Sequence, residues 1–275
     1  MDDHDDDLER FEADGALPLP AAAHHGYVEH DAARIWYAAY GSGPPVLLLH
    51  GGFGNGENWG YQVPALLDAG ARAILIDSRG HGRSTRDARP FTYELMASDV
   101  VAVMDALHVD KAAFVGWSDG ATIALILAMQ HPTRVAGVFF FGGNMDPSGV
   151  KETSETMPII GRIFGRHTRD YARLSSTPKR FDAFAEALVL MMKTQPSYTK
   201  RELAQIRVAV TIAHGVQDEF IKREHAEYLA RSIPGAALAV LPEVSHFAPL
   251  QRPKVFNSSM LAFLEGIHLV REGSP

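Results

Sequence analysis

The sequence of 275 residues contains no cysteine, which excludes disulfides, thiolate metal sites and a cysteine nucleophile. Long apolar runs are also missing, and no segment approaches the roughly 18 consecutive apolar residues that cross a bilayer. The first residues lack the basic and apolar regions of a signal peptide. The lack of cysteine does not decide the compartment, but the lack of a signal peptide and of a membrane-spanning run predicts a cytoplasmic protein that makes no contact with membranes.

Basic residues are fewer than acidic ones, with 26 Lys and Arg against 33 Asp and Glu and a net charge of −7. This balance argues against nucleic acid as a partner, because phosphate binding requires a basic face. Residues 1–9 are mostly acidic and include almost no apolar side chain, so they cannot bury enough surface to fold. We therefore expect residues 1–25 to be a disordered acidic tail and linker, in preference to a metal site.

Apolar segments with strand and helix patterns alternate along the rest of the chain. Strands are predicted at residues 26–29, 33–40, 46–49, 72–77, 111–116, 134–141, 208–213 and 237–241, and helices at 58–68, 92–107, 119–129, 223–232 and 253–267. The first two strands form an antiparallel edge hairpin, and continuous apolar runs suit strands buried on both faces. The pattern predicts an α/β fold with a mostly parallel eight-stranded sheet and helices on both faces.

The alternation is interrupted after residue 145. We therefore divide the folded part into a first core segment (26–145), a helical cap (146–198) and a second core segment (199–275). The cap is expected to cover the carboxyl ends of the strands and to line a substrate pocket. Its candidate inner face, or packing surface against the core, consists of Met157, Ile159, Ile160, Phe164, Phe184, Leu188, Met191 and Met192.

Residues 116–120 (GWSDG) stand between a predicted strand and a predicted helix. In the pattern G-x-S-x-G the serine occupies a strained turn that exposes its hydroxyl, and the glycines allow close passage of neighbouring backbone. The N–H groups at the start of the helix favour a developing oxyanion. This context identifies Ser118 as a candidate nucleophile.

A serine nucleophile requires a base and a group that orients the base. Asp218 and His246 follow two later predicted strands, in the order acid then histidine that this turn leads one to expect. All three residues fall at carboxyl ends of strands, where open α/β sheets build their sites. We therefore predict Ser118, Asp218 and His246 as catalytic residues.

Other carboxylates could compete for the role of the acid. Asp146 follows a strand and is the less favoured alternative, whereas Asp77 is expected to hold the turn after its own strand. Glu243 is interpreted as a solvated loop residue. These assignments leave Asp218 as the preferred partner of His246.

The glycine-rich loop at residues 50–54 follows the first long apolar strand. Its backbone N–H groups can complete an oxyanion hole together with the N–H of Asp119, with either Gly52 or Phe53 as the donor. His50 is expected to hold the loop by a hydrogen bond. A phosphate-binding role is disfavoured, because the lysine and hydroxyl spacing of a P-loop is missing.

These motifs resemble those of the α/β-hydrolase superfamily over residues 26 to about 270. The matching segments are residues 50–52 (HGG), 77–84 (DSRGHGRS), 116–120 (GWSDG), 215–218 (GVQD) and 245–247 (SHF). The GWSDG segment is further similar to the biphenyl hydrolase-like (valacyclovirase-like) esterases. This resemblance implies hydrolysis of carboxylic esters, a helical cap, and neither cofactor nor metal. It also implies that the Asp119 side chain binds a substrate ammonium, although an aspartate at a helix N-terminus is equally an ordinary cap.

We therefore expect a serine hydrolase acting on a small-molecule ester, as a monomer or homodimer, with Trp117, Asp119 and Phe247 in contact with the substrate. The same three catalytic residues could instead hydrolyse lactones, cleave carbon–carbon bonds or act as a cofactor-free perhydrolase. Haloalkane dehalogenase and epoxide hydrolase chemistry is disfavoured, because it requires a carboxylate in place of Ser118. A hydrolase-like protein that only binds a ligand is the alternative outside enzymes.

Overall fold

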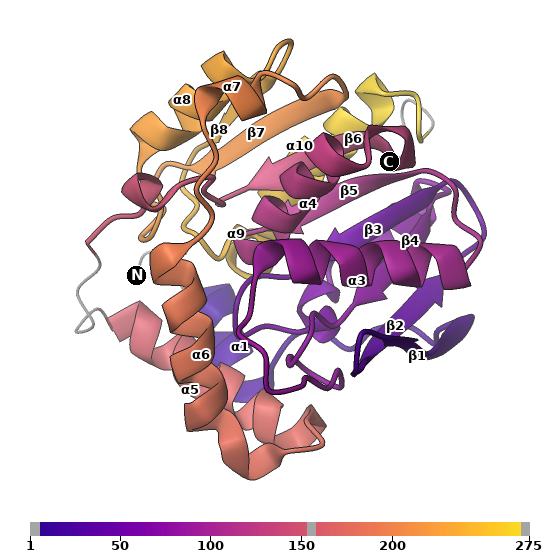
Figure 1. Ribbon diagram of the computed structural model, residues 1–275, viewed down its shortest axis with the longest axis vertical. Helices are drawn as coiled ribbons and strands as arrows, with labels where there is room; N and C mark the ends of the chain where they lie inside the picture. Colours follow the sequence, from indigo (N-terminus) through magenta and orange to yellow (C-terminus); the bar gives the residue numbers. More distant parts are fainter. Residues whose placement is uncertain (1–5, 153–157, 271–275) are drawn as a thin grey trace.

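The computed structural model describes residues 6–152 and 158–270, and the sheet at its centre has eight strands (Figure 1). The order across the sheet is β1-β2-β4-β3-β5-β6-β7-β8; β2 is antiparallel to β1 and β4, and all other pairs are parallel. The strands are β1 (His24–His30), β2 (Ala33–Tyr40), β3 (Pro45–Leu49), β4 (Arg72–Ile76), β5 (Ala112–Trp117), β6 (Val135–Phe141), β7 (Ala209–Gly215) and β8 (Ala237–Leu241). The predicted sheet is confirmed, including its edge hairpin.

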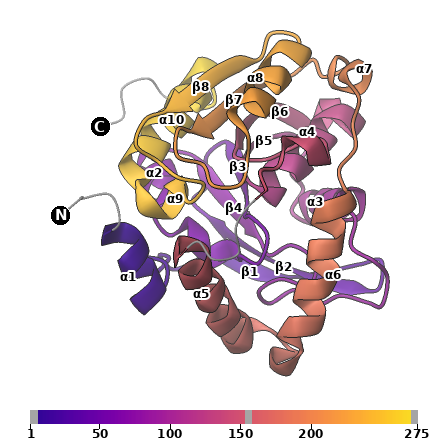
Figure 2. The same ribbon diagram turned by 90° about the vertical axis from the view of Figure 1, so that its left-hand side faces the viewer.

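Helices cover both faces of this sheet, which explains why the central strands are almost wholly apolar. Leu47 of β3 belongs to a hydrophobic cluster with α3 and α4, while the next residue, Leu48, belongs to a second cluster with α2 and α10. Figure 2 shows α2, α9 and α10 on one side of the strands and α3 and α4 on the other. The bounds are α2 (Gln62–Asp68), α3 (Tyr93–Ala106), α4 (Asp119–Gln130), α7 (Lys200–Leu203), α8 (Arg223–Ser232), α9 (Ala248–Gln251) and α10 (Pro253–Gly266). Within the described ranges, no helix has the length and apolarity that crossing a membrane demands.

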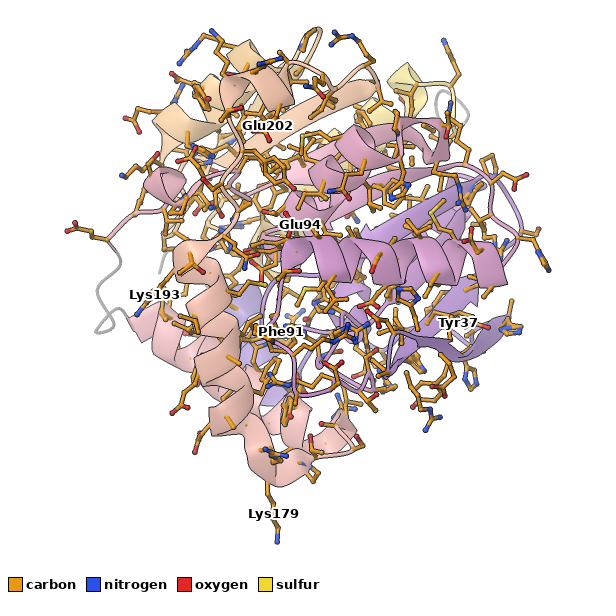
Figure 3. The ribbon with its side chains drawn as sticks, viewed as in Figure 1. Tyr37, Phe91, Glu94, Lys179, Lys193 and Glu202 are labelled. Carbon is orange, nitrogen blue, oxygen red and sulfur yellow. The ribbon has the colours of Figure 1, made fainter. Side chains whose placement is uncertain are left out.

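Two long helices, α5 (Pro158–Leu174) and α6 (Phe181–Thr194), are inserted between β6 and β7. Aromatic side chains join them to the core: Phe184 of α6 packs edge-on against Phe91, with ring centroids 6.0 Å apart, and Phe91 lies between α6 and the sheet (Figure 3). After α6, Tyr198 donates a hydrogen bond of 2.7 Å to Glu94. Figure 3 shows Glu94 at the start of α3. The insertion is therefore tied to the core at more than one place.

The N-terminal segment differs from the expected disordered tail, because residues 6–14 form the helix α1 (Asp6–Asp14). Leu8 and Phe11, three residues apart, give it one apolar edge that is buried to 2% exposure. Its acidic side faces arginines of α5, and Arg162 lies 3.9 Å from the carboxylates of both Glu9 and Glu12. The prediction was wrong here because the partners of α1 are about 150 residues away in the sequence.

The helix predicted at residues 58–68 is divided into a 3-10 helix, η1 (Gly56–Trp59), and α2. The break falls at Gly60, where a Cβ atom would stand 2.0 Å from the carbonyl oxygen of Leu17. The N-terminal arm thus crosses the chain at this point and leaves no room for a side chain. The other 3-10 helices of the described residues are η2 (Pro132–Arg134), η3 (Pro147–Gly149) and η4 (Pro178–Arg180).

Candidate active site

Ser118 occupies the single-residue turn between β5 and α4. Its backbone angles are φ 54° and ψ −120°, a strained conformation for a residue with a side chain. A Cβ at Gly116 would lie 2.5 Å from the carbonyl of Gly120, and a Cβ at Gly120 would lie 2.0 Å from that of Leu49. The two glycines therefore let α4 start directly against β3 and β5, which pushes Ser118 outward.

His246 and Asp218 form a buried pair on the loops after β8 and β7. The Nδ1 atom of His246 lies 3.0 Å from Oδ2 and 3.1 Å from Oδ1 of Asp218. Oδ1 also accepts the backbone N–H groups of Phe220 and Ile221, both at 2.8 Å. Gly142, directly after β6, packs closely against the pair, since a Cβ there would stand 3.1 Å from His246 Nδ1.

The electrostatics of this pair favour an ionised acid beside a basic imidazole. Burial raises the pKa of Asp218, but the charge of His246 and the hydrogen bonds to the carboxylate outweigh it, so the pKa is lowered. Burial lowers the pKa of His246, but the Asp218 carboxylate outweighs that effect and the pKa is raised. Asp218 can therefore hold one imidazole tautomer and stabilise the imidazolium.

Ser118 and His246 line one cavity of about 550 Å³. Residues 51–53 of the glycine-rich loop lie on its wall, and a Cβ at Gly51 would stand 3.1 Å from the Cβ of Ser118. His50 anchors this loop, because its Nδ1 lies 2.7 Å from the carbonyl of Gly51 and its Nε2 accepts the N–H of Ser78. The expected anchoring role of His50 agrees with these bonds. The donation of an N–H to the oxyanion by Gly52 or Phe53 stays a prediction.

Asp119 places a buried carboxylate on the cavity wall next to Ser118. The hydroxyl of Tyr93 donates to its Oδ1 at 2.7 Å, whereas Oδ2 has no hydrogen-bond partner among the described residues. Burial raises the pKa of Asp119 to about 6, although the bond from Tyr93 and the charge of His246 act in the opposite direction. Tyr93 was not anticipated, since it lies 26 residues upstream at the start of α3.

Trp117 and Phe247 also reach the cavity wall, and their rings pack edge to face with centroids 6.1 Å apart. The indole Nε1 of Trp117 is directed at the backbone, where it donates to the carbonyl of His246 at 2.8 Å. On the other side of the histidine, Glu219 accepts the backbone N–H of His246 at 2.9 Å. Glu219 was not anticipated, and its position next to Asp218 was the only signal for it in the sequence.

The rival carboxylates are engaged elsewhere. Asp146 accepts the N–H of Ser148 and lies 3.8 Å from the ring of His225. Asp77 accepts the N–H groups of Gly56 and Arg83, so it holds the turn that it was expected to hold. Glu243 is exposed on its loop.

The inserted helices form the outer wall of the cavity. Of the candidate inner-face residues, Ile160, Phe164 and Met192 line it, and Met157 lies outside the described residues. The others are absent from the lining, and four residues of these two helices that were not anticipated take part: Ile163, His167, Val189 and Lys193. Phe53 of the glycine-rich loop packs edge-on against Phe164, with ring centroids 5.2 Å apart, so the loop and the insertion share one aromatic cluster.

Comparison with known proteins identifies relatives over most of the chain. The sequence pattern of a family described as the alpha/beta hydrolase fold matches residues 44–190. The chain is 28% identical to the human serine hydrolase BPHL over 255 residues, which cover 86% of this chain and 84% of that protein. It is 29% identical to the dihydrolipoyllysine-residue acetyltransferase component of the acetoin cleaving system of Cupriavidus necator, covering 92% and 72%. Among solved structures it is similar to Est816, described as an N-acyl homoserine lactone degrading enzyme, with 31% identity, a TM-score of 0.67 and coverage of 86% and 100%.

Proposed function

Because the chain belongs to the alpha/beta hydrolase family, we propose that it is a serine hydrolase that cleaves small carboxylic esters. One observation carries the proposal: Ser118, on its strained turn, shares a cavity with His246, whose Nδ1 is held by Asp218. This is the arrangement by which a histidine can activate a serine hydroxyl.

The first half of the reaction is acyl transfer to the serine. The Ser118 oxygen attacks the ester carbonyl carbon while Nε2 of His246 takes the hydroxyl proton, since Nδ1 is occupied by Asp218. The N–H of Asp119 and that of Gly52 or Phe53 stabilise the oxyanion, each by about 3 kcal/mol. The carbon–oxygen bond to the alcohol then breaks, and the alcohol leaves with the proton held by His246.

The second half releases the acid by the same groups. His246 takes a proton from water as the water oxygen attacks the acyl carbon of the ester to Ser118. The bond to the serine oxygen breaks, and the proton returns from His246 to Ser118. In the proposed reaction, the helices α5 and α6 act as a cap that excludes bulk water and provides an apolar surface for the acyl or alcohol group.

The nucleophile is tested by Ser118→Ala. We expect the variant to lose esterase activity by more than about 10⁴-fold, because no acyl-enzyme can form without the serine hydroxyl. A fluorophosphonate should label the wild-type protein at Ser118 and leave the variant unlabelled, while circular dichroism shows that both are folded. Turnover of the variant at the wild-type rate would contradict the assignment.

A lactone is the second candidate substrate, because the similar structure Est816 is described as degrading N-acyl homoserine lactones. The cavity wall includes Ile160, Phe164 and Met192, which could accommodate an acyl chain. Values of kcat/KM for a panel of p-nitrophenyl esters, amino-acid esters and lactones of increasing acyl length distinguish a linear ester from a lactone as the preferred substrate. Preference for the lactones would replace the linear ester as the proposed substrate without changing the catalytic residues.

A further inference from the structure

The main chain of His246 is held by side chains from two other elements. His246 lies between the end of β8 and the start of α9, in a segment without regular structure. Its carbonyl accepts the indole N–H of Trp117 at 2.8 Å, and its N–H donates to Glu219 at 2.9 Å. Both of its backbone polar groups are therefore satisfied by side chains, so the loop needs no regular structure to hold the residue in place.

The two partners are chain neighbours of the other predicted catalytic residues. Trp117 is the last residue of β5 and directly precedes Ser118, while Glu219 directly follows Asp218. The bond from Trp117 thus relates the histidine to the nucleophile, and the bond to Glu219 relates it to the acid. Displacement of about 1 Å between reacting groups can cost 10²-fold in rate, so such bonds affect catalysis directly.

We propose that Trp117 and Glu219 are positioning residues that clamp the backbone of His246 between the nucleophile turn and the acid loop. This inference rests on the proposed function, because it assigns His246 the role of catalytic base. It gives Trp117 a task other than the substrate contact expected from the sequence. A substrate contact would act mainly on KM, whereas a clamp on the base acts mainly on kcat.

Glu219 also contributes charge, which has to be separated from its hydrogen bond. The carboxylates of Asp218, Glu219 and Asp119 all raise the pKa of His246, and His214 on β7 lies within electrostatic range of its ring. Burial raises the pKa of Glu219 itself. Glu219→Gln removes the charge and keeps an oxygen acceptor, whereas Glu219→Ala removes both, so their difference measures the bond.

The chain offers a matched control for each side of the clamp. Trp59 is fully buried, its ring lies 6.3 Å from that of Trp117, and its Nε1 has no hydrogen-bond partner within the described residues. Trp59→Phe therefore removes an indole at no cost in hydrogen bonds. Glu243→Gln removes a negative charge three residues from His246, from an exposed side chain.

The experiment measures kcat, KM and their pH dependence for all variants on one activated ester. Trp117→Phe and Glu219→Ala are each expected to lower kcat by about 10- to 100-fold with KM changed less than about threefold. Glu219→Gln should retain kcat within about threefold at high pH and shift the acidic limb to lower pH, because a charge that raises the pKa of His246 is gone. Both controls should resemble the wild type.

The proposal is overturned if Trp117→Phe is no worse than Trp59→Phe, if its effect lies in KM, or if Glu219→Ala and Glu219→Gln behave alike. Failure of the proposed function is a separate result, seen as wild-type protein that a fluorophosphonate does not label. In that event the hydrogen bond to Glu219 is tested by NMR. The backbone amide proton of His246 should lose its hydrogen-bonded chemical shift in Glu219→Ala and keep it in Glu219→Gln. An unchanged shift in both variants would refute it.

Discussion

At the scale of single residues, Asp119 combines two properties that rarely occur together on a cavity wall. The residue is 9% exposed, and Oδ2 is buried with no partner among the described residues, yet a pKa of about 6 leaves the carboxyl ionised at neutral pH. A buried anion with one oxygen unpaired is costly, and a cationic group on a ligand would relieve that cost. That a substrate ammonium binds Asp119, as expected from the resemblance, stays a prediction, and so does the alternative that its charge only stabilises the N-terminus of α4.

The first residue-scale prediction compares a cationic amino-acid ester with a neutral ester of similar size. Asp119→Asn should raise KM for the cationic ester by about 10-fold or more, since a charge-assisted hydrogen bond contributes about 1.5–3 kcal/mol, and should leave the neutral ester within about threefold. In the wild type, the ratio of the two kcat/KM values should fall as the pH drops below 6, where the carboxyl becomes protonated. The ratio cancels the protonation of His246, so an equal loss for both esters would contradict the prediction.

At the scale of elements, α1 joins the insertion to the core. It packs against both α5 and α9, and α1 and α5 lie side by side in Figure 2. Phe11 contacts the ring of His167, with centroids 6.0 Å apart, and His167 lines the cavity. The N-terminal helix therefore supports the outer wall of the site from behind.

Truncation of that contact should reduce stability and loosen the site. Phe11→Ala is expected to lower the free energy of unfolding by about 3 kcal/mol, as for other buried aromatic residues, and to raise KM because α5 loses its support. Glu9→Ala, an exposed residue on the same helix, should cost less than about 0.5 kcal/mol. Denaturant titration and ester kinetics measure both effects. Equal stabilities of the two variants would show that the packing of α1 contributes nothing.

The elements that could be predicted from sequence are those specified by local patterns. The apolar run of β3 and the glycines around Ser118 carry their own signals, and Asp218 and His246 could be found because each follows a strand. The bond between Tyr93 and Asp119 could not, because it joins α3 to α4 across 26 residues without a motif. The role of Glu219 could not be predicted either, because no motif marks it and only the fold brings it to the backbone N–H of His246.

At the scale of the whole molecule, buried histidines in the core and in the insertion are expected to make the stability of the fold depend on pH. The rings of His50 and His81 pack against each other at a tilt, with centroids 5.2 Å apart, His81 packs on Phe184 of α6, and His167 packs on α1. Burial lowers the pKa of all three, for His167 to about 4. Among the titratable groups around His167, Asp170 raises its pKa, whereas His50 and Arg166 lower it.

These histidines should lower the free energy of unfolding in acid, because they take up protons more readily in the unfolded chain than in the folded protein. The variant His167→Phe isolates the contribution of His167. A histidine with a lowered pKa in the folded state costs nothing above pH 6.5, and its unfavourable effect develops as the pH falls from 6.5 towards 4, because the unfolded chain then binds more protons. Asp119, with its pKa raised to about 6, acts in the opposite direction as the pH falls from 6 to 3.8, so the wild-type profile alone is ambiguous. The difference between wild type and His167→Phe removes that ambiguity: the variant should lose about 2 kcal/mol less than the wild type between about pH 7.5 and pH 5. Urea titrations at the two pH values measure it, and parallel losses in both proteins would show that His167 does not titrate with unfolding.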